Sequence, residues 1–174
     1  MKIRISLFVL LIIFTFSSIT FAALITDVGV NVTESAGIWT YEYTVENSLS
    51  SNETVWSFSV DIAADVFNIL SPSNWYVWQW GDTGTVEWNS DYHLYYAYDI
   101  WPGCSLSGFS FQSNYGPGNL GYKIEGWDID NDDYGSTNTG TTSAPVPEPS
   151  TMILLGSLAT GLFGMAGLRK RFKR

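Results

Sequence analysis

Carboxylates and aromatic rings are the side chains of this sequence whose types and spacing could do chemistry. Glu87, Asp91 and Asp99 lie close together in the chain, and a pair of Asp or Glu residues is what most glycoside hydrolases use to cleave a glycosidic bond. A domain with so many acids also contains such pairs by chance. A glycoside hydrolase is therefore the remote alternative, and no catalytic residue is predicted.

The acidic run near residue 130 suggests a cation site. Asp128, Asp130 and Asp132 alternate as in the first half of a calcium-binding loop, and Asp133 follows them. Such a loop has Gly at its sixth position and Glu at its twelfth, where this chain has Asp133 and Thr139. The hypothesis is a looser Ca²⁺ site, with a solvated acidic loop as the alternative. No other cofactor is expected.

The chain has one histidine and one cysteine. His93 has no recognisable nucleophile paired with it and is predicted to face solvent from a strand. Cys104 cannot form an intramolecular disulfide alone and is predicted to be a small buried or turn residue. An intermolecular disulfide is its alternative.

Aromatic residues are concentrated between Trp75 and Trp101. Strands through this window would place rings on both faces of a sheet, so some rings should be exposed and able to stack on the apolar faces of sugars. The alternative is cross-strand packing of the same rings inside the core. The residues predicted to form a carbohydrate-binding surface are Trp75, Trp78, Trp80, Trp88, Tyr95 and Trp101.

The elements that must position these residues are strands. Apolar residues alternate with polar ones from Trp39 to Val45 and from Trp56 to Ile62, which is the period of a half-buried strand. Turn-forming clusters separate the segments, and Pro102-Gly103 is typical of a type II turn. The further segments predicted as strands are Val28 to Thr33, Val66 to Leu70, Trp75 to Trp80, Thr85 to Trp88, Tyr92 to Tyr98, Ser105 to Gln112 and Leu120 to Asp128. The prediction is an all-β fold, an antiparallel β-sandwich of about 8–9 strands.

Charge is segregated along the chain. The 174 residues include 8 Lys and Arg and 17 Asp and Glu, for a net charge of −9. All 17 acids lie between Asp27 and Glu148, where Lys123 is the one basic residue, so this stretch carries 1 − 17 = −16. Such a domain has too little positive charge to neutralise phosphates, which excludes nucleic acid as a partner.

The N-terminus has the pattern of a secretory signal. Residues 1–23 combine a basic start, an apolar run and small residues, and signal peptidase is expected to cut after Ala22 or Ala23. The remainder is therefore predicted to be exported.

The C-terminus has the pattern of a membrane anchor. Residues 151–168 contain no charge, and as a helix they would span about 27 Å, enough for the bilayer core. The basic residues that follow would stop transfer and hold this end in the cytoplasm. They are Arg169, Lys170, Arg171, Lys173 and Arg174.

The segment before this helix, Val146-Pro147-Glu148-Pro149-Ser150-Thr151, together with the helix and the basic tail, resembles the PEP-CTERM sorting signal of Gram-negative bacteria. The resemblance assigns Pro147, Glu148 and Pro149 as the sorting motif. It implies that exosortase processes the inner-membrane precursor at or near this motif and passes the protein to the cell surface or extracellular matrix. It also implies an association with exopolysaccharide.

Four segments are thus predicted: a signal peptide over 1–23, the β-sandwich ectodomain over 24–133, a linker rich in Ser, Thr, Gly and Pro over 134–146, and the sorting signal over 147–174. The expected role is a non-enzymatic surface or matrix component linked to exopolysaccharide or biofilm. The alternative is a carbohydrate-binding module that uses the aromatic cluster.

Overall fold

Strands account for the regular structure of the described part of the chain. The computed structural model describes residues 24–80, 84–90 and 96–147. Within these ranges lie β1 (Thr26–Ser35), β2 (Ile38–Asn47), β3 (Thr54–Asp61), β4 (Phe67–Leu70), β5 (Trp75–Trp80), β6 (Thr85–Ser90), β7 (Ser105–Ser113), β8 (Pro117–Asp128) and β9 (Asp133–Pro145).

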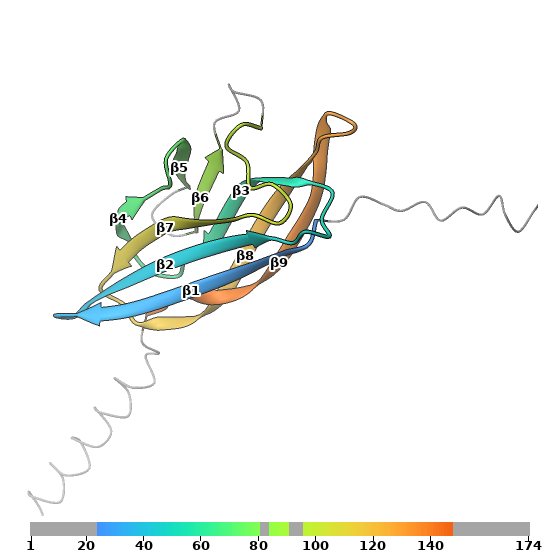
Figure 1. The fold of residues 1–174 in the computed structure, drawn as a ribbon. Helices are drawn as coiled ribbons and strands as arrows, with labels where there is room; N and C mark the ends of the chain where they lie inside the picture. The colour runs from blue at the N-terminus through green and yellow to red at the C-terminus, as the bar shows by residue number, and fades with distance from the viewer. Residues whose placement is uncertain (1–23, 81–83, 91–95, 148–174) are drawn as a thin grey trace, which may run out of the picture.

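The strands form two antiparallel sheets that face each other (Figure 1). One sheet has four strands in the order β1-β2-β7-β4, and the other has five in the order β5-β6-β3-β8-β9. The nine described strands confirm the predicted antiparallel β-sandwich.

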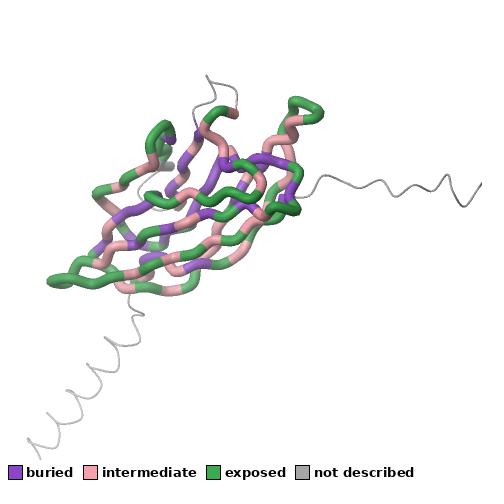
Figure 2. The backbone as a smooth tube through the Cα atoms, viewed as in Figure 1, coloured by how far each residue is buried: buried purple, intermediate pink, exposed green. Residues whose placement is uncertain are grey.

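The hydrophobic core lies between the two sheets, where buried segments of β2, β3, β6 and β7 meet (Figure 2). On β2 the predicted alternation is confirmed, because Tyr41, Tyr43 and Val45 are fully buried while Glu42 and Glu46 are exposed. Trp88 of β6 stacks on Phe58 of the neighbouring β3, with ring centroids 5.4 Å apart. Aromatic packing of this kind fills the space between the sheets.

One residue of β3 departs from the predicted alternation. The register between β3 and β8 shifts between Val55 and Ser57, so Trp56 is an extra residue with no partner on β8. Such a bulge moves every residue before it to the opposite face. Val55 therefore enters the core beside Phe58, and Trp56 is on the outer face instead of the predicted core face.

The prediction of a linker over residues 134–146 is wrong. Most of it is β9, an edge strand paired along its length with β8. Its Ser, Thr and Gly composition indicated a loop, but the backbone supplies the pairing and small side chains suffice at a sheet edge. The buried Glu53 side chain also holds β9, because its carboxylate accepts hydrogen bonds from Ser136 N at 2.6 Å and Ser136 Oγ at 2.7 Å.

The connection between β6 and β7 lacks, in its described residues, the strand that was predicted there, but it has the predicted turn. Residues 96–98 form a turn, with Tyr96 at φ 57°, where a strand over Tyr92 to Tyr98 was predicted. The Pro102-Gly103 turn is type II, as predicted. Gly103 has φ 80°, and Cys104 N donates to Trp101 O at 2.9 Å.

The predicted signal peptide, the sorting helix over 151–168 and the basic tail lie outside the described residues. Within the described ranges, no helix has the length and apolar character needed to cross a membrane.

Candidate functional site

A cavity of about 930 Å³ opens on the outer face of the five-stranded sheet. The pairing register explains how residues distant in sequence meet there. Tyr76 pairs with Asn89, and Trp127 pairs with Tyr134. The cavity is lined by Trp56, Tyr76, Val77, Trp78, Asn89, Ser90, Tyr96, Asp99, Trp127, Asp132 and Tyr134, so all five strands of this sheet contribute to it.

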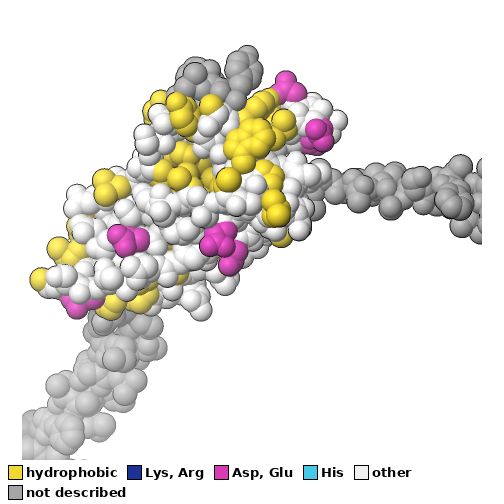
Figure 3. Space-filling model, in the orientation of Figure 1, with side chains coloured by type: hydrophobic (Ala, Val, Ile, Leu, Met, Phe, Trp, Pro, Cys, Tyr) yellow, Lys and Arg dark blue, Asp and Glu magenta, His cyan; other side chains and the backbone are white. Residues whose placement is uncertain are grey.

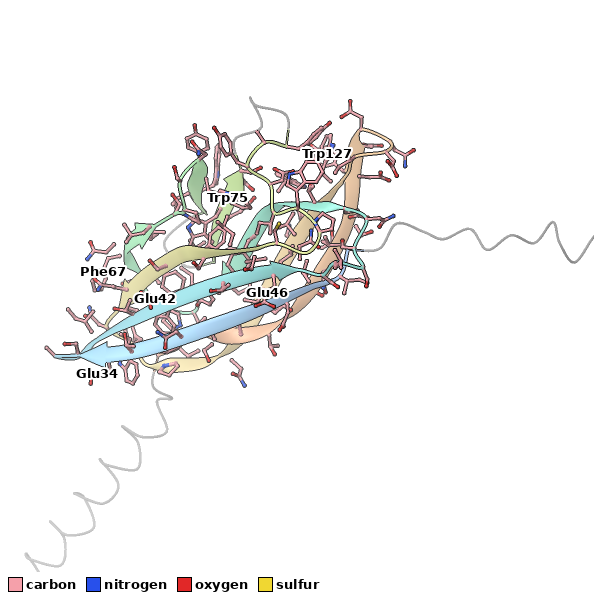
Figure 4. The ribbon with its side chains drawn as sticks, viewed as in Figure 1. Glu34, Glu42, Glu46, Phe67, Trp75 and Trp127 are labelled. Atoms are coloured by element: carbon pink, nitrogen blue, oxygen red, sulfur yellow. The ribbon has the colours of Figure 1, made fainter. Side chains whose placement is uncertain are left out.

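Four of the rings form a continuous wall. Tyr96 and Trp127 have centroids 5.7 Å apart, Trp127 and Tyr134 5.2 Å, and Tyr134 and Trp56 5.8 Å. Trp127 lies close to the β8–β9 hairpin (Figure 4). Hydrophobic side chains gather toward this end of the domain, with acidic side chains at their edge (Figure 3).

The other aromatic residues of the cavity come from β5, at the opposite edge of the sheet. The side chains of Tyr76 and Trp78 are 58% and 57% exposed, respectively. They are two residues apart on one strand, so they point to the same side of the sheet. The cavity therefore has large, partly exposed rings at both ends.

Asp99 is the partly buried acid of the cavity. Its Oδ2 accepts a hydrogen bond from Thr54 Oγ1 at 2.7 Å, and its Oδ1 accepts one from Ser90 Oγ at 2.5 Å. Burial raises the pKa of Asp99 above its ordinary value of 3.8, although these two hydrogen bonds act in the opposite direction. A second carboxylate, Asp132, accepts a hydrogen bond from the Tyr96 hydroxyl.

Two polar atoms in the lining residues lack partners. Asn89 Oδ1 and Trp127 Nε1 are both buried, and neither has a hydrogen-bond partner within the described structure. A buried polar atom without a partner is uncommon, because leaving it unpaired costs about 1–3 kcal/mol. One of these atoms is an acceptor and the other a donor, and both are closed to solvent in this structure.

The structure separates the six residues predicted to bind carbohydrate. Trp78 lines the cavity. Trp75 and Trp88 are core residues, 3% and 0% exposed, so the prediction is wrong for them. Trp101 is exposed but does not line the cavity, and the side chains of Trp80 and Tyr95 lie outside the described part.

Of the six rings that line the cavity, only Trp78 was predicted to bind carbohydrate. Tyr76 and Tyr96 lie within the predicted window from Trp75 to Trp101, whereas Trp56, Trp127 and Tyr134 lie outside it. Trp56 was assigned to the core face because a bulge leaves no sign in the apolar alternation. Tyr134 was assigned to the linker, and Trp127 lies 26 residues beyond the predicted cluster, which ends at Trp101. Trp127 directly precedes the acidic run that begins at Asp128, and Tyr134 directly follows its last residue, Asp133. This adjacency was the one sequence signal that could have found the two rings.

The acidic hairpin between β8 and β9 does not have the arrangement of a calcium site. Asp128 uses its carboxylate locally, accepting hydrogen bonds from the backbone N of Asp130 and from both the backbone N and the side-chain amide of Asn131. These bonds lower the pKa of Asp128, the side-chain amide of Asn131 most of all. No group of three or more His, Cys, Asp or Glu side chains among the described residues could hold a metal ion. Asp130, Asp132 and Asp133 therefore do not converge with Asp128 as the calcium hypothesis required.

The remaining candidates for chemistry lie apart. Glu87 lines a neighbouring cavity and accepts a hydrogen bond from Ser57 Oγ at 3.4 Å, whereas Asp99 lines the aromatic cavity. Asp91 and His93 lie outside the described residues. Cys104 is a free, exposed thiol next to the type II turn.

The C-terminal end of the described structure leads directly into the predicted sorting segment. Val146 N donates to Gly116 O at 3.1 Å, and Pro147 is the last described residue. The family of PEP-CTERM protein-sorting motifs matches residues 145–171. This chain carries a PEP-CTERM sorting motif. The motif makes the protein an exosortase substrate that is exported and sorted to the cell surface.

Comparison of the PEP-CTERM protein with solved structures shows a similarity of fold alone. Among curated proteins the chain has no match. A cohesin module from a family 33 glycoside hydrolase of Clostridium perfringens matches with 7% identity and a TM-score of 0.41, covering 72% of this chain and 100% of that one.

Two structures of a GH20 exo-β-N-acetylglucosaminidase from Vibrio harveyi also match. The inactive mutant has 14% identity and a TM-score of 0.38, and the complex with N-acetylglucosamine has 13% and 0.36. The matches cover 71% and 70% of this chain but only 18% and 17% of the enzyme chains.

Proposed function

We propose that the exported sandwich is a non-enzymatic, carbohydrate-binding component of the cell surface or extracellular matrix, and that the aromatic cavity is its sugar site. The observation that carries the proposal is a cavity that joins a wall of aromatic rings to the carboxylates of Asp99 and Asp132.

The chemistry of a sugar fits this cavity on two counts. A pyranose ring presents apolar C–H faces, which pack on aromatic rings, and hydroxyls, which both donate and accept hydrogen bonds. Ligand sites generally combine apolar walls with a few placed polar groups. The exposed Tyr76 and Trp78 and the wall from Tyr96 to Trp56 supply the first component, and Asp99 and Asp132 supply the second.

The location of the protein supports a polymeric ligand. A domain sorted to the cell surface meets exopolysaccharide there, and the resemblance to exosortase substrates associates the protein with such polymers. The charge of −16 between Asp27 and Glu148 disfavours polyanions such as nucleic acid. A role in a polysaccharide or biofilm matrix follows.

The test uses the full chain purified in a non-glycosidic detergent, because a maltoside would compete for a sugar site. Retention is measured on a panel of insoluble polysaccharides that includes the producing organism's own matrix. We expect retention by wild type, loss of retention by Trp78→Ala, and no loss by Tyr115→Ala, which removes an exposed ring outside the cavity.

Two results would overturn the proposal. One is the absence of retention on every polymer in the panel. The other is the release of shorter oligosaccharides from a retained polymer by the wild-type chain, since that outcome would establish the glycoside hydrolase.

A further inference from the structure

The aromatic cavity carries negative charge that the described protein does not neutralise. Asp99 and Asp132 both line it. Lys123 is the one Lys or Arg among residues 24–147. It forms a 3.0 Å ion pair with Glu125 and lines the neighbouring cavity instead.

Asp99 has capacity for a cationic partner. Its described hydrogen bonds come from two hydroxyl groups, one to each carboxylate oxygen. Each oxygen of an ionised carboxylate can accept about two hydrogen bonds, so an acceptor position on each oxygen remains. A partly buried carboxylate without a counterion is unfavourable, and a ligand cation in the cavity would relieve that cost.

The rings that line the cavity with Asp99 favour the same kind of ligand. The face of a Trp or Tyr ring carries negative electrostatic potential, and a cation within about 6 Å of its centroid is attracted to it. Tyr96, Trp127 and Tyr134 form contiguous rings in the wall of this cavity. A cation in the cavity would therefore meet both a carboxylate and aromatic faces.

We infer that the cavity selects sugar units that carry a free ammonium group, that is, deacetylated amino sugars, and that Asp99 is the residue that accepts the ammonium. This inference rests on the proposed carbohydrate-binding function and names its substrate class. The ammonium donates to the remaining acceptor positions of Asp99, while the sugar ring lies against the aromatic wall.

Calorimetry with three hexasaccharides of equal length tests this inference: a glucosamine hexamer, an N-acetylglucosamine hexamer and cellohexaose. The full chain in non-glycosidic detergent is titrated at a pH where the amine is protonated. A charge-assisted hydrogen bond predicts about 10- to 100-fold tighter binding of the glucosamine hexamer than of the other two.

Two charge-neutralising variants separate a specific contact from the general acidity of the domain. Asp99→Asn keeps the shape of the side chain, and we expect it to abolish the preference for the glucosamine hexamer. Glu87→Gln removes the same unit of charge from β6, and Glu87 lines the neighbouring cavity. We expect this variant to retain the preference.

The outcomes distinguish the two proposals. Equal affinity of wild type for all three hexasaccharides, or an equal loss in Asp99→Asn and Glu87→Gln, would overturn the selection of amino sugars and leave carbohydrate binding standing. If neither the hexasaccharides nor any polysaccharide of the panel binds, the proposed function itself fails. The comparison among ligands needs only the wild-type chain, so it holds even if a variant does not fold.

Discussion

The hydroxyl of Tyr43 donates a 2.7 Å hydrogen bond to the backbone carbonyl of Ser143. Tyr43 lies on β2 of the four-stranded sheet and Ser143 on β9 of the five-stranded sheet, so this bond crosses the core between residues 100 positions apart. Tyr43 is fully buried, and burial raises the pKa of its hydroxyl far above the ordinary value. The hydroxyl therefore stays protonated and remains a donor.

Replacing Tyr43 by Phe keeps the ring and removes this bond. We expect the free energy of unfolding to fall by about 1–2 kcal/mol, because the Ser143 carbonyl loses its partner in a buried setting. Urea denaturation followed by tryptophan fluorescence measures the change. Tyr41→Phe is the matched control. Its hydroxyl donates to the carbonyl of Tyr115, a residue more exposed than Ser143, and an equal or larger loss there would contradict the importance of the bond between the sheets.

The raised pKa of Asp99 predicts a pH dependence of stability. The folded state binds the Asp99 proton more tightly than the unfolded state, so the stability linked to this group is fully present below the unfolded pKa of 3.8. It is lost as the pH rises through the folded pKa. Asp99→Asn removes this dependence, and the stability of the variant relative to wild type should therefore increase with pH.

Urea denaturation of both chains from pH 3 upward tests this linkage, and taking the difference between them cancels the titration of the other acids. A difference that stays constant across this range, or one that decreases with pH, would show that the Asp99 carboxyl is not desolvated in the folded protein.

Two tryptophans of the aromatic wall provide opposite predictions. Trp56 Nε1 donates to Gly126 O at 3.0 Å, whereas Trp127 Nε1 is buried without a partner in the described structure. Trp56→Phe should lower the free energy of unfolding by about 1 kcal/mol beyond the loss of ring area, since a protein hydrogen bond disappears. Trp127→Phe should cost less stability than Trp56→Phe, because it removes no hydrogen bond within the described structure. It should weaken sugar binding more, by about 5- to 10-fold, because it replaces the central ring of the aromatic wall and removes its Nε1 donor.

Thermal unfolding and calorimetry on the two variants measure both quantities. If Trp127→Phe binds sugar as wild type does, the unpartnered donor has no role in recognition.

Sorting should depend on the motif directly after the sandwich. We expect a Pro147→Ala/Glu148→Ala chain to accumulate as the membrane precursor, because the family's processing enzyme recognises this segment. Fractionation and immunoblotting of cells with an intact exosortase locus measure the precursor. Glu46→Ala, which removes an exposed acid on β2, is the control and should be processed normally. A double variant that leaves the membrane at the wild-type rate would contradict motif-directed sorting.

Local pattern predicted the sandwich well but predicted the site poorly. The alternation from Trp39 to Val45 reflects which face of a single strand is buried. It can be read from consecutive residues of that strand alone. The cavity depends instead on strand pairing. Trp127 and Tyr134 flank a hairpin and pair with each other, and Trp56 reaches the same face only through a bulge.

The tryptophans of the predicted cluster show the converse difficulty. Trp75 and Trp78 lie on the same strand, yet one is 3% exposed and the other 57%. Composition finds both residues. They are three residues apart and therefore point to opposite faces of the sheet, and only the side on which the other sheet packs decides which ring is covered. In β9 a similar limit applied, since small polar residues are compatible with either a loop or an edge strand.

The course of β9 also determines how far the cavity lies from the sorting motif. This strand begins at Asp133, next to the cavity, and ends at Pro145, two residues before the sorting motif. Its 13 residues, at about 3.3 Å each, extend over about 40 Å. Because β9 is paired along its length with β8, the cavity and the start of the sorting segment are held at opposite ends of one stiff strand. We therefore expect a polymer bound in the proposed site to lie at the end of the domain away from the sorting signal.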